Sequence, residues 1–221
     1  MEWTLAGDRK PYYEGIFTAH EDQSWDNAPG KNVLIKALDH KFGQGDLGNS
    51  EQLIDLGCGT GFFLNRIHSE VCDSWGLTGV DFAETAIKKG RGRHPDLSLH
   101  CQDASATDFP DGQFSVLTNY GSLEHFPNPR EGVIESARLL RPGGLFLLMI
   151  PTLGVYRSDR DDEGWYEDLS GQPQWNFWRQ TWESFFMEAG LVLDETAKAE
   201  QFGALKPGVF YFGRKLSESR E

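Results

Sequence analysis

The sequence contains few cysteines and no long apolar run. Its three cysteines, Cys58, Cys72 and Cys101, are too few and too scattered for a disulfide framework or a cysteine-based metal cluster. No apolar run approaches the roughly 20 residues that cross a membrane, and the first ten residues, MEWTLAGDRK, contain no apolar signal core. We therefore expect a cytoplasmic protein with no membrane partner.

Basic residues are also scarce. Lysine and arginine together number 21, against 34 aspartates and glutamates, which gives a formal net charge of −13. Proteins that bind nucleic acid need a basic surface to neutralise phosphates. The charge balance therefore argues against a nucleic-acid partner.

The apolar content is sufficient for a folded core. Of the 221 residues, 38% are hydrophobic and 13% are aromatic. A chain of this length suits one α/β domain with some additional segments. We therefore expect a single domain over residues 1–221.

The most informative stretch begins EQLIDLGCGTGFF at residue 51. Residues 53–56 form a short apolar run that is typical of a buried strand, and helix-like spacing begins at Phe62. Between them, Gly57, Gly59 and Gly61 allow a tight turn whose backbone amides approach a ligand closely. Such a turn between a strand and a helix indicates a ligand-binding loop.

An acidic residue follows at the position that a nucleoside site requires. Residues 75–80 form a second apolar strand, and Asp81 stands at its C-terminal end. An acid about 20 residues after such glycines is placed to accept hydrogen bonds from both hydroxyls of a ribose. The stretch therefore predicts a nucleoside-binding site.

The spacing of the glycines indicates which nucleoside binds. The dinucleotide fingerprint is G-x-G-x-x-G, whereas here the pattern is G-x-G-x-G and Phe62 takes the place of the third glycine. Asp55, just before the loop, would repel a pyrophosphate but can meet an α-ammonium group directly or through water. This combination resembles motif I of the class I S-adenosylmethionine-dependent methyltransferases, and Asp81 resembles their ribose-binding acid. The alternative is a glycine-rich turn in an ordinary α/β protein.

The resemblance implies S-adenosyl-L-methionine as the cofactor. In the family, an acid and a small residue after the third strand contact the adenine, and Asp103 and Ala104 hold those places here. The alternative for Asp103 is a turn residue that caps its own backbone. The expected cofactor-binding residues are Asp55, Gly57, Cys58, Gly59, Gly61, Asp81, Phe82, Gln102, Asp103, Ala104 and Asn119.

Strands and helices alternate over most of the chain, which implies a parallel, doubly wound sheet. We expect a Rossmann-like, mostly parallel seven-stranded sheet flanked by helices, and the resemblance adds an antiparallel C-terminal hairpin strand. The expected strands are residues 53–56, 75–80, 97–101, 114–117, 145–150, 191–196 and 209–214. The expected helices follow residue 62 and cover residues 31–43, 83–93, 128–140 and 181–189.

The fourth strand leads into residues 118–126, TNYGSLEHF. Ligands sit beyond the C-terminal ends of parallel strands, so this run is expected beside the methyl donor. It resembles the "LEH" segment of small-molecule methyltransferases related to those of ubiquinone and menaquinone synthesis. A few relatives carry E-x-x-E-H there and bind a metal, but Gly121 replaces the first glutamate here, and Glu124 with His125 alone makes a weak metal site. We expect no metal.

Two segments lie outside the resemblance. Residues 1–30 are polar and aromatic and are either a surface arm or a cap over the cofactor. Residues 151–180 are long and aromatic, which is typical of a lid over the acceptor, with a packed decoration as the alternative. We expect the cofactor-binding core in residues 31–150 and a C-terminal helix and strands in residues 181–221.

The predicted function is transfer of a methyl group to an O or N atom of a small molecule. His125 is the candidate general base, unless it packs against or caps the following helix, and Tyr120 is the candidate wall of the methyl channel. The alternatives are an NAD- or nucleotide-sugar-dependent enzyme and a non-enzymatic scaffold. A protein or nucleic-acid methyltransferase also remains open. The sequence does not identify the acceptor or the oligomeric state.

Overall fold

A computed structural model describes residues 10–19, 30–153, 163–167, 173–198 and 208–217. The larger sheet has seven strands in the order β3-β2-β1-β4-β5-β9-β8. Its strands are β1 (Gln52–Leu56), β2 (Gly76–Asp81), β3 (Ser98–Cys101), β4 (Phe114–Tyr120), β5 (Leu140–Ile150), β8 (Leu191–Lys198) and β9 (Val209–Lys215). The first five run parallel, and β9 is antiparallel to both β5 and β8. The predicted sheet and its antiparallel hairpin strand are confirmed.

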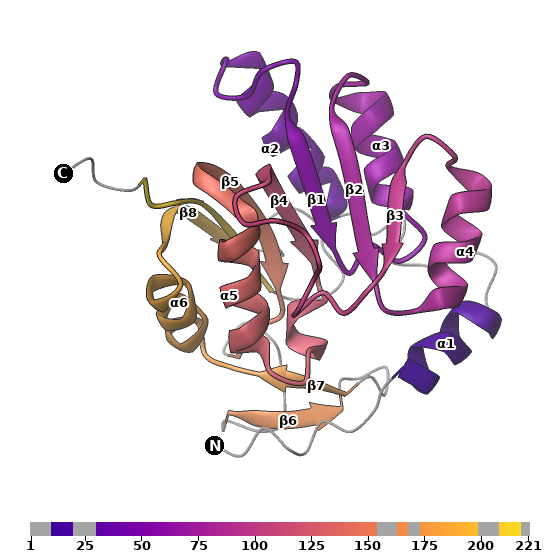
Figure 1. Cartoon of the computed structure of the whole chain (residues 1–221). Helices are drawn as coiled ribbons and strands as arrows, with labels where there is room; N and C mark the ends of the chain where they lie inside the picture. The colour runs from indigo at the N-terminus through magenta and orange to yellow at the C-terminus, as the bar shows by residue number, and fades with distance from the viewer. Residues whose placement is uncertain (1–9, 20–29, 154–162, 168–172, 199–207, 218–221) are drawn as a thin grey trace.

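Helices cover both faces of this sheet (Figure 1). Buried residues of α2 (Lys31–Gly43), α3 (Phe62–Glu70) and α4 (Glu84–Arg93) pack in one cluster. Those of α5 (Pro129–Leu139) and α6 (Arg179–Glu188) pack in another. Side chains alternate along a strand, so β5 sends Phe146 and Leu148 to the second cluster and Leu145 and Leu147 to the first.

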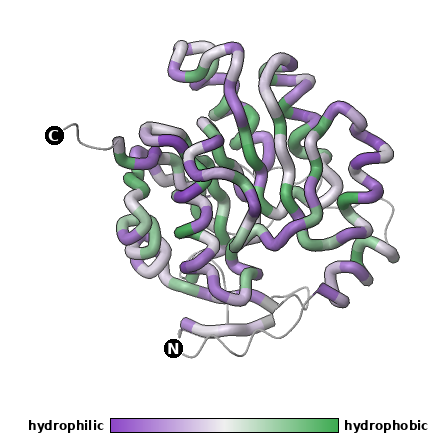
Figure 2. The backbone as a smooth tube through the Cα atoms, viewed as in Figure 1, coloured by the Kyte–Doolittle hydropathy of each residue, from purple (hydrophilic) through white to green (hydrophobic). Residues whose placement is uncertain are grey.

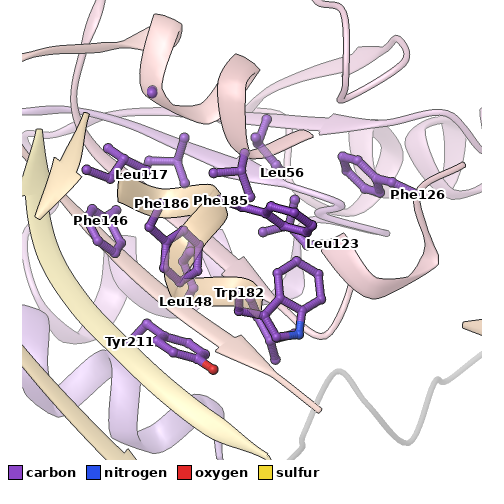
Figure 3. Packing of buried hydrophobic residues seen from close by; sticks show 14 of the residues in the cluster. Leu56, Leu117, Leu123, Phe126, Phe146, Leu148, Trp182, Phe185, Phe186 and Tyr211 are labelled. Carbon is purple, nitrogen blue, oxygen red and sulfur yellow. The ribbon is translucent and has the colours of Figure 1, made fainter. Parts of the chain in front are cut away.

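The second cluster is rich in aromatic side chains (Figure 3). Phe186 of α6 meets Tyr211 of β9 with ring centroids 5.1 Å apart, and Trp182 is fully buried. Figure 2 shows where hydrophobic residues lie along the chain: they are on the central strands, and hydrophilic residues are on the outer turns. Burying each large side chain contributes roughly 1.5–3 kcal/mol.

None of the described helices is long and apolar enough to cross a membrane.

The two segments outside the resemblance contain described elements that were not predicted from the sequence. A helix, α1 (Lys10–Ala19), lies in the segment expected to be an arm or a cap. A two-stranded hairpin, β6 (Gly164–Glu167) and β7 (Pro173–Asn176), lies in the expected lid. The arrowheads of β1, β2 and β3 point to the side of the molecule where both elements lie (Figure 1). Both elements are therefore on the side where a ligand of a parallel sheet is expected.

Candidate functional site

The glycine turn has a backbone conformation that glycine adopts without strain. Gly57, Gly59 and Gly61 have φ angles of 76°, 56° and 77°, a region that costs other residues roughly 1–2 kcal/mol. The amides of Gly57 and Cys58 donate to the carbonyl of Val80 at 2.8 and 3.0 Å, which fixes the turn beside the end of β2. The predicted turn between β1 and α3 is thus formed as expected.

Asp81 is the acid at the end of β2 and is only 7% exposed. Its Oδ2 accepts from the Gly59 amide at 2.9 Å, and its Oδ1 accepts from the Ala83 amide at 2.9 Å. Burial, with a smaller contribution from the charge of Glu14, raises the pKa of this carboxyl to about 6, against the opposing effect of the two amide hydrogen bonds. Asp81 therefore couples the glycine turn to the start of α4.

Asp55 is the second buried acid, 5% exposed, at the end of β1. Thr118 of β4 donates its hydroxyl to Asp55 Oδ1 at 2.7 Å. Burial raises the pKa of Asp55 to about 6, against the opposing effects of the Thr118 hydrogen bond and the positive charge of Lys31. Lys31 is also buried, and its place at the start of a predicted helix was no sign of that burial.

Cys58 and Asn119 are both buried against the turn. Burial, with the charges of Asp81 and Asp55, raises the pKa of the Cys58 thiol well above its ordinary range, so the thiol stays protonated. The Asn119 amide donates to the Leu56 carbonyl at 2.6 Å, and its oxygen accepts from the amides of Ser122 and Leu123. Asn119 thus ties the end of β1 to the turn after β4, and its contact with a cofactor stays a prediction.

The residues after β3 are arranged as a turn. Asp103 Oδ1 accepts from the amide and the hydroxyl of Ser105 at 2.8 and 2.6 Å, as the turn-capping alternative predicts. Gln102 Oε1 accepts from the Asp108 amide at 3.0 Å, and Ala104 is buried in the core cluster. Phe82 lies half-buried just after Asp81. The roles of these residues in adenine binding stay predictions.

Tyr120, Glu124 and His125 lie at the C-terminal end of β4 and in the short 3-10 helix η2 (Leu123–His125). The Glu124 side chain is almost fully buried, and its Oε1 lies 3.7 Å from His125 Nε2. Burial and the charge of Glu124 raise the pKa of Tyr120 to about 12. Tyr120 therefore stays protonated at neutral pH, which suits a wall or a hydrogen-bond donor better than a base. The described residues contain no group of three metal-ligating side chains that could hold an ion.

The helix α1 covers the glycine turn. Phe17 is 5% exposed, and a Cβ added at Gly59 would lie 3.4 Å from the Phe17 ring. Tyr13 makes edge-to-face contacts with Phe82 and His125, with centroids 5.3 and 5.9 Å apart. Tyr13 and Phe17 are four residues apart, which is the spacing of one helical face, a signal that the expectation of an arm or a cap for residues 1–30 did not use.

Charged contacts hold α1 against α4. The Glu14 carboxylate accepts from the amides of Glu84 and Thr85 at 2.6 and 3.0 Å, which caps the start of α4. Lys89 of α4 donates to the carbonyl of Phe17 at 2.6 Å. Glu14 was not predicted as a site residue, because a cap from a distant helix leaves no local sequence signal.

The described part of the expected lid packs into the core. Trp175 and Phe177 are 2% and 1% exposed, and their rings stack with centroids 5.6 Å apart. Trp175 also donates its indole N–H to the carbonyl of Pro127 at 3.3 Å, next to η2. This packing matches the alternative that the segment is a packed decoration. Outside the described residues lie several aromatic and acidic residues of the two segments: Trp3, Trp25, Tyr156, Asp159, Asp161, Asp162 and Asp168.

A cavity of about 630 Å³ lies elsewhere, between α2 and the strands β5, β8 and β9. Its lining residues include Val33, Leu147, Phe212, Lys36 and Asp194. None of the predicted cofactor residues lines it. The candidate site is therefore the polar cluster around the glycine turn.

Comparisons with known proteins show which proteins this chain is similar to. Residues 54–148 match a family model described as a methyltransferase domain. The chain is 28% identical over 129 residues to a probable S-adenosylmethionine-dependent methyltransferase of Mycolicibacterium smegmatis, covering 58% of this chain and 47% of the relative. It is 27% identical over 148 residues to a demethylmenaquinone methyltransferase of Paenarthrobacter aurescens, covering 66% and 53%. The chain thus spans about half the length of these two curated relatives.

A solved structure shares the fold. The chain superposes on a Burkholderia thailandensis 1,6-didemethyltoxoflavin-N1-methyltransferase with bound 1,6-didemethyltoxoflavin and S-adenosylhomocysteine, with a TM-score of 0.71. The match covers 94% of this chain and 87% of that one at 16% identity. At that identity the likeness concerns the fold alone.

Proposed function

We propose that this chain, whose residues 54–148 match a methyltransferase-domain model, is an S-adenosylmethionine-dependent methyltransferase that transfers a methyl group from S-adenosyl-L-methionine to an O or N atom of a small molecule. The observation that carries the proposal is the buried Asp81 carboxylate beside the left-handed glycine turn. Four acceptor positions belong to a carboxylate, and two are taken by the amides of Gly59 and Ala83. The remaining positions suit the two hydroxyls of a ribose.

The residues of the cluster fit the cofactor. Burial holds the pKa of both Asp55 and Asp81 at about 6, so each is ionised at neutral pH in surroundings that disfavour the charge. An α-ammonium group would stabilise the buried negative charge of Asp55, and ribose hydroxyls would stabilise that of Asp81. When bound, the cofactor supplies a sulfonium methyl group whose leaving group is neutral.

The chain's own residues would align the acceptor and exclude water, because the leaving group is already activated. Tyr120, held protonated, would line the methyl channel. His125 would take the proton of an acceptor that loses one, and the neighbouring Glu124 carboxylate would stabilise the resulting imidazolium. Phe82, Gln102, Asp103 and Ala104 would surround the adenine.

The N-terminal segment and the 151–180 segment would complete the enclosure. Phe17 and Tyr13 of α1 already pack on Gly59 and Phe82, so residues 1–30 would act as a cap over the core of residues 31–150. The β6–β7 hairpin would form the packed base of the acceptor side. With a net charge of −13 we propose no nucleic-acid substrate, and the cytoplasmic location expected from the scattered cysteines stays part of the proposal.

The test is binding of S-adenosylhomocysteine to the Asp81→Asn variant, measured by calorimetry. Asparagine keeps the size of the side chain but loses its charge, so affinity should fall about 30-fold, since charge-assisted hydrogen bonds contribute about 2 kcal/mol. Asp96→Asn, at an exposed position, is the control and should bind as the wild type does. Unchanged affinity in a folded Asp81→Asn protein would refute the assignment of Asp81.

A further inference from the structure

The cavity beside α2 lies at a step in the surface of the molecule. Its lining residues come from α2 and from the strands β5, β9 and β8, and β8 is the last strand of the sheet. Helices α5 and α6 pack on the opposite face. On the cavity side the surface therefore drops from a helix, roughly 10 Å in diameter, to a sheet face beside it.

The sheet face beside α2 is largely apolar. Leu147, Phe212 and Ala197 line the cavity, one from each of the three strands. Val192 of β8 pairs with Arg214, two residues after Phe212, so Val192 lies on the same face. Its side chain is 42% exposed. An exposed apolar side chain next to an apolar cavity is typical of a surface that contacts another molecule.

The two walls of the cavity carry opposite charges. Helix α2 contributes Lys36, His40 and Lys41, and β8 contributes Asp194 and Glu195. Lys41 and Asp194 already form ion pairs within the chain. Lys36 and Glu195 are exposed, and within the described part of the chain neither forms an ion pair. One positive and one negative side chain therefore stand on opposite walls.

A surface with this step and these charges is complementary to a second copy of itself. A two-fold axis that runs along the cavity, parallel to the strands, places α2 of each copy on the sheet face of the other. The same rotation brings the basic wall of each copy against the acidic wall of the other, so Lys36 meets Glu195 of the second copy at two equivalent contacts. A two-fold axis across the cavity would instead place α2 against α2, with like charges facing each other.

We propose that α2 and the cavity-side face of β9 and β8 form the interface of a homodimer with the two-fold axis along the cavity. Helix α2 has 13 residues and is therefore about 20 Å long. Together with the adjoining strands it covers a footprint of roughly 400 Å² per copy. This is smaller than the roughly 800 Å² per partner of a standard interface, so a dissociation constant in the micromolar range is expected. The inference does not depend on the proposed function.

The first measurement is analytical ultracentrifugation of the full chain at low salt, at protein concentrations from about 1 to about 300 μM, which span this range of dissociation constants. The average mass should rise with concentration from the 24.9 kDa of one chain toward twice that value. Added salt should weaken the association, because the charged contacts at the rim of the interface are screened.

Two charge reversals test the arrangement. Lys36→Glu and Glu195→Lys each place like charges at both contacts, so each alone should weaken the dimer about tenfold. An equal mixture of the two variants should restore dimers close to the strength of the wild type, because both contacts of the mixed dimer again join a positive and a negative side chain. Lys88→Glu, at an exposed position of α4, changes the net charge as Lys36→Glu does and should leave the dimer intact.

Three results would overturn the inference. A protein that stays monomeric at every concentration would leave the cavity to a different partner. A dimer that neither reversal weakens would indicate another interface or the arrangement of α2 against α2, in which like charges already face each other. A mixture that associates no better than the single variants would contradict the pairing of Lys36 with Glu195.

Discussion

Two buried carboxyl groups set the electrostatics of the candidate site. Burial raises the pKa of Asp55 and of Asp81 from the ordinary 3.8 to about 6. Each group therefore binds its proton more tightly in the folded chain than in the unfolded chain. Protonation stabilises the fold, and this contribution is lost as the pH rises from about 4 through about 6. Ionisation has a stability cost that a bound cofactor would offset.

The affinity for S-adenosylhomocysteine should consequently depend on pH. Both proposed contacts need ionised carboxylates, so binding should strengthen between pH 5 and pH 8, with the change centred near pH 6. At pH 5 each protonated carboxyl should weaken binding about tenfold. Calorimetry across this range measures the effect, and Asp55→Asn should reduce the slope. An affinity that stays flat from pH 5 to pH 8 would contradict the contacts.

The glycine turn gives a second prediction at this scale. Gly57→Ala should destabilise the fold by more than about 2 kcal/mol, because the residue has a φ of 76° and the new Cβ would lie 2.5 Å from Ser122 Cβ. Urea denaturation measures the change.

The matched control for that variant is Gly45→Ala. Gly45 has a φ of 80° but open space around the position of a Cβ, so this variant should lose only the backbone contribution of roughly 1–2 kcal/mol. Equal losses at both positions would mean that the contact with Ser122 has no effect on stability.

Among single residues, the sequence predicted those whose signal is local. Gly57, Gly59 and Asp81 follow from the spacing of a strand, a turn and a second strand, and the structure brings them together. Lys31 and Glu14 were missed because their partners, Asp55 and the first amides of α4, lie far away in the chain. A buried lysine cannot be recognised before the packing that buries it is known.

At the scale of elements, the β6–β7 hairpin raises the question of whether its segment is a lid or part of the core. Trp175 is 2% exposed and stacks on Phe177, whereas Trp178, three residues later, is 39% exposed. These two tryptophans provide a test within one short segment.

Trp175→Ala should lower the free energy of unfolding by about 3–5 kcal/mol, because a large buried side chain is replaced by a cavity. Trp178→Ala should change it by less than about 1 kcal/mol. Chemical denaturation of the two variants provides the comparison. Similar small effects in both would mean that the hairpin is a detachable lid with no share in the core.

The strands and helices that alternate along the sheet were predictable from the sequence, whereas α1 and the β6–β7 hairpin were not. Short continuous apolar runs identified the main strands, because both faces of a parallel sheet are buried, and apolar residues with 3.6-residue spacing identified the main helices. The bounds of β5 were missed, since Leu140 already pairs with Phe114 ahead of a bulge. Helix α1 carries one aromatic face, Tyr13 and Phe17, which is too short a pattern to distinguish a helix from an arm.

At the scale of the whole molecule, the fold, the glycine turn and the match of residues 54–148 to a methyltransferase-domain model all support the proposed cofactor. The formal charge of −13 favours a cationic ligand such as a sulfonium over a polyanion. Helix α1 packs on the glycine turn from before the core, and the β6–β7 hairpin, which we propose as the base of the acceptor side, follows β5. The acceptor would then enter between two elements that lie outside the matched domain.

The most direct test of the account is a parallel calorimetric titration of the purified protein with S-adenosylmethionine, S-adenosylhomocysteine and NAD. The account predicts micromolar binding of both sulfur nucleosides and none of NAD, since Phe62 replaces the third glycine of the dinucleotide pattern and Asp55 would repel a pyrophosphate. Binding of NAD alone, or of none of the three, would contradict it.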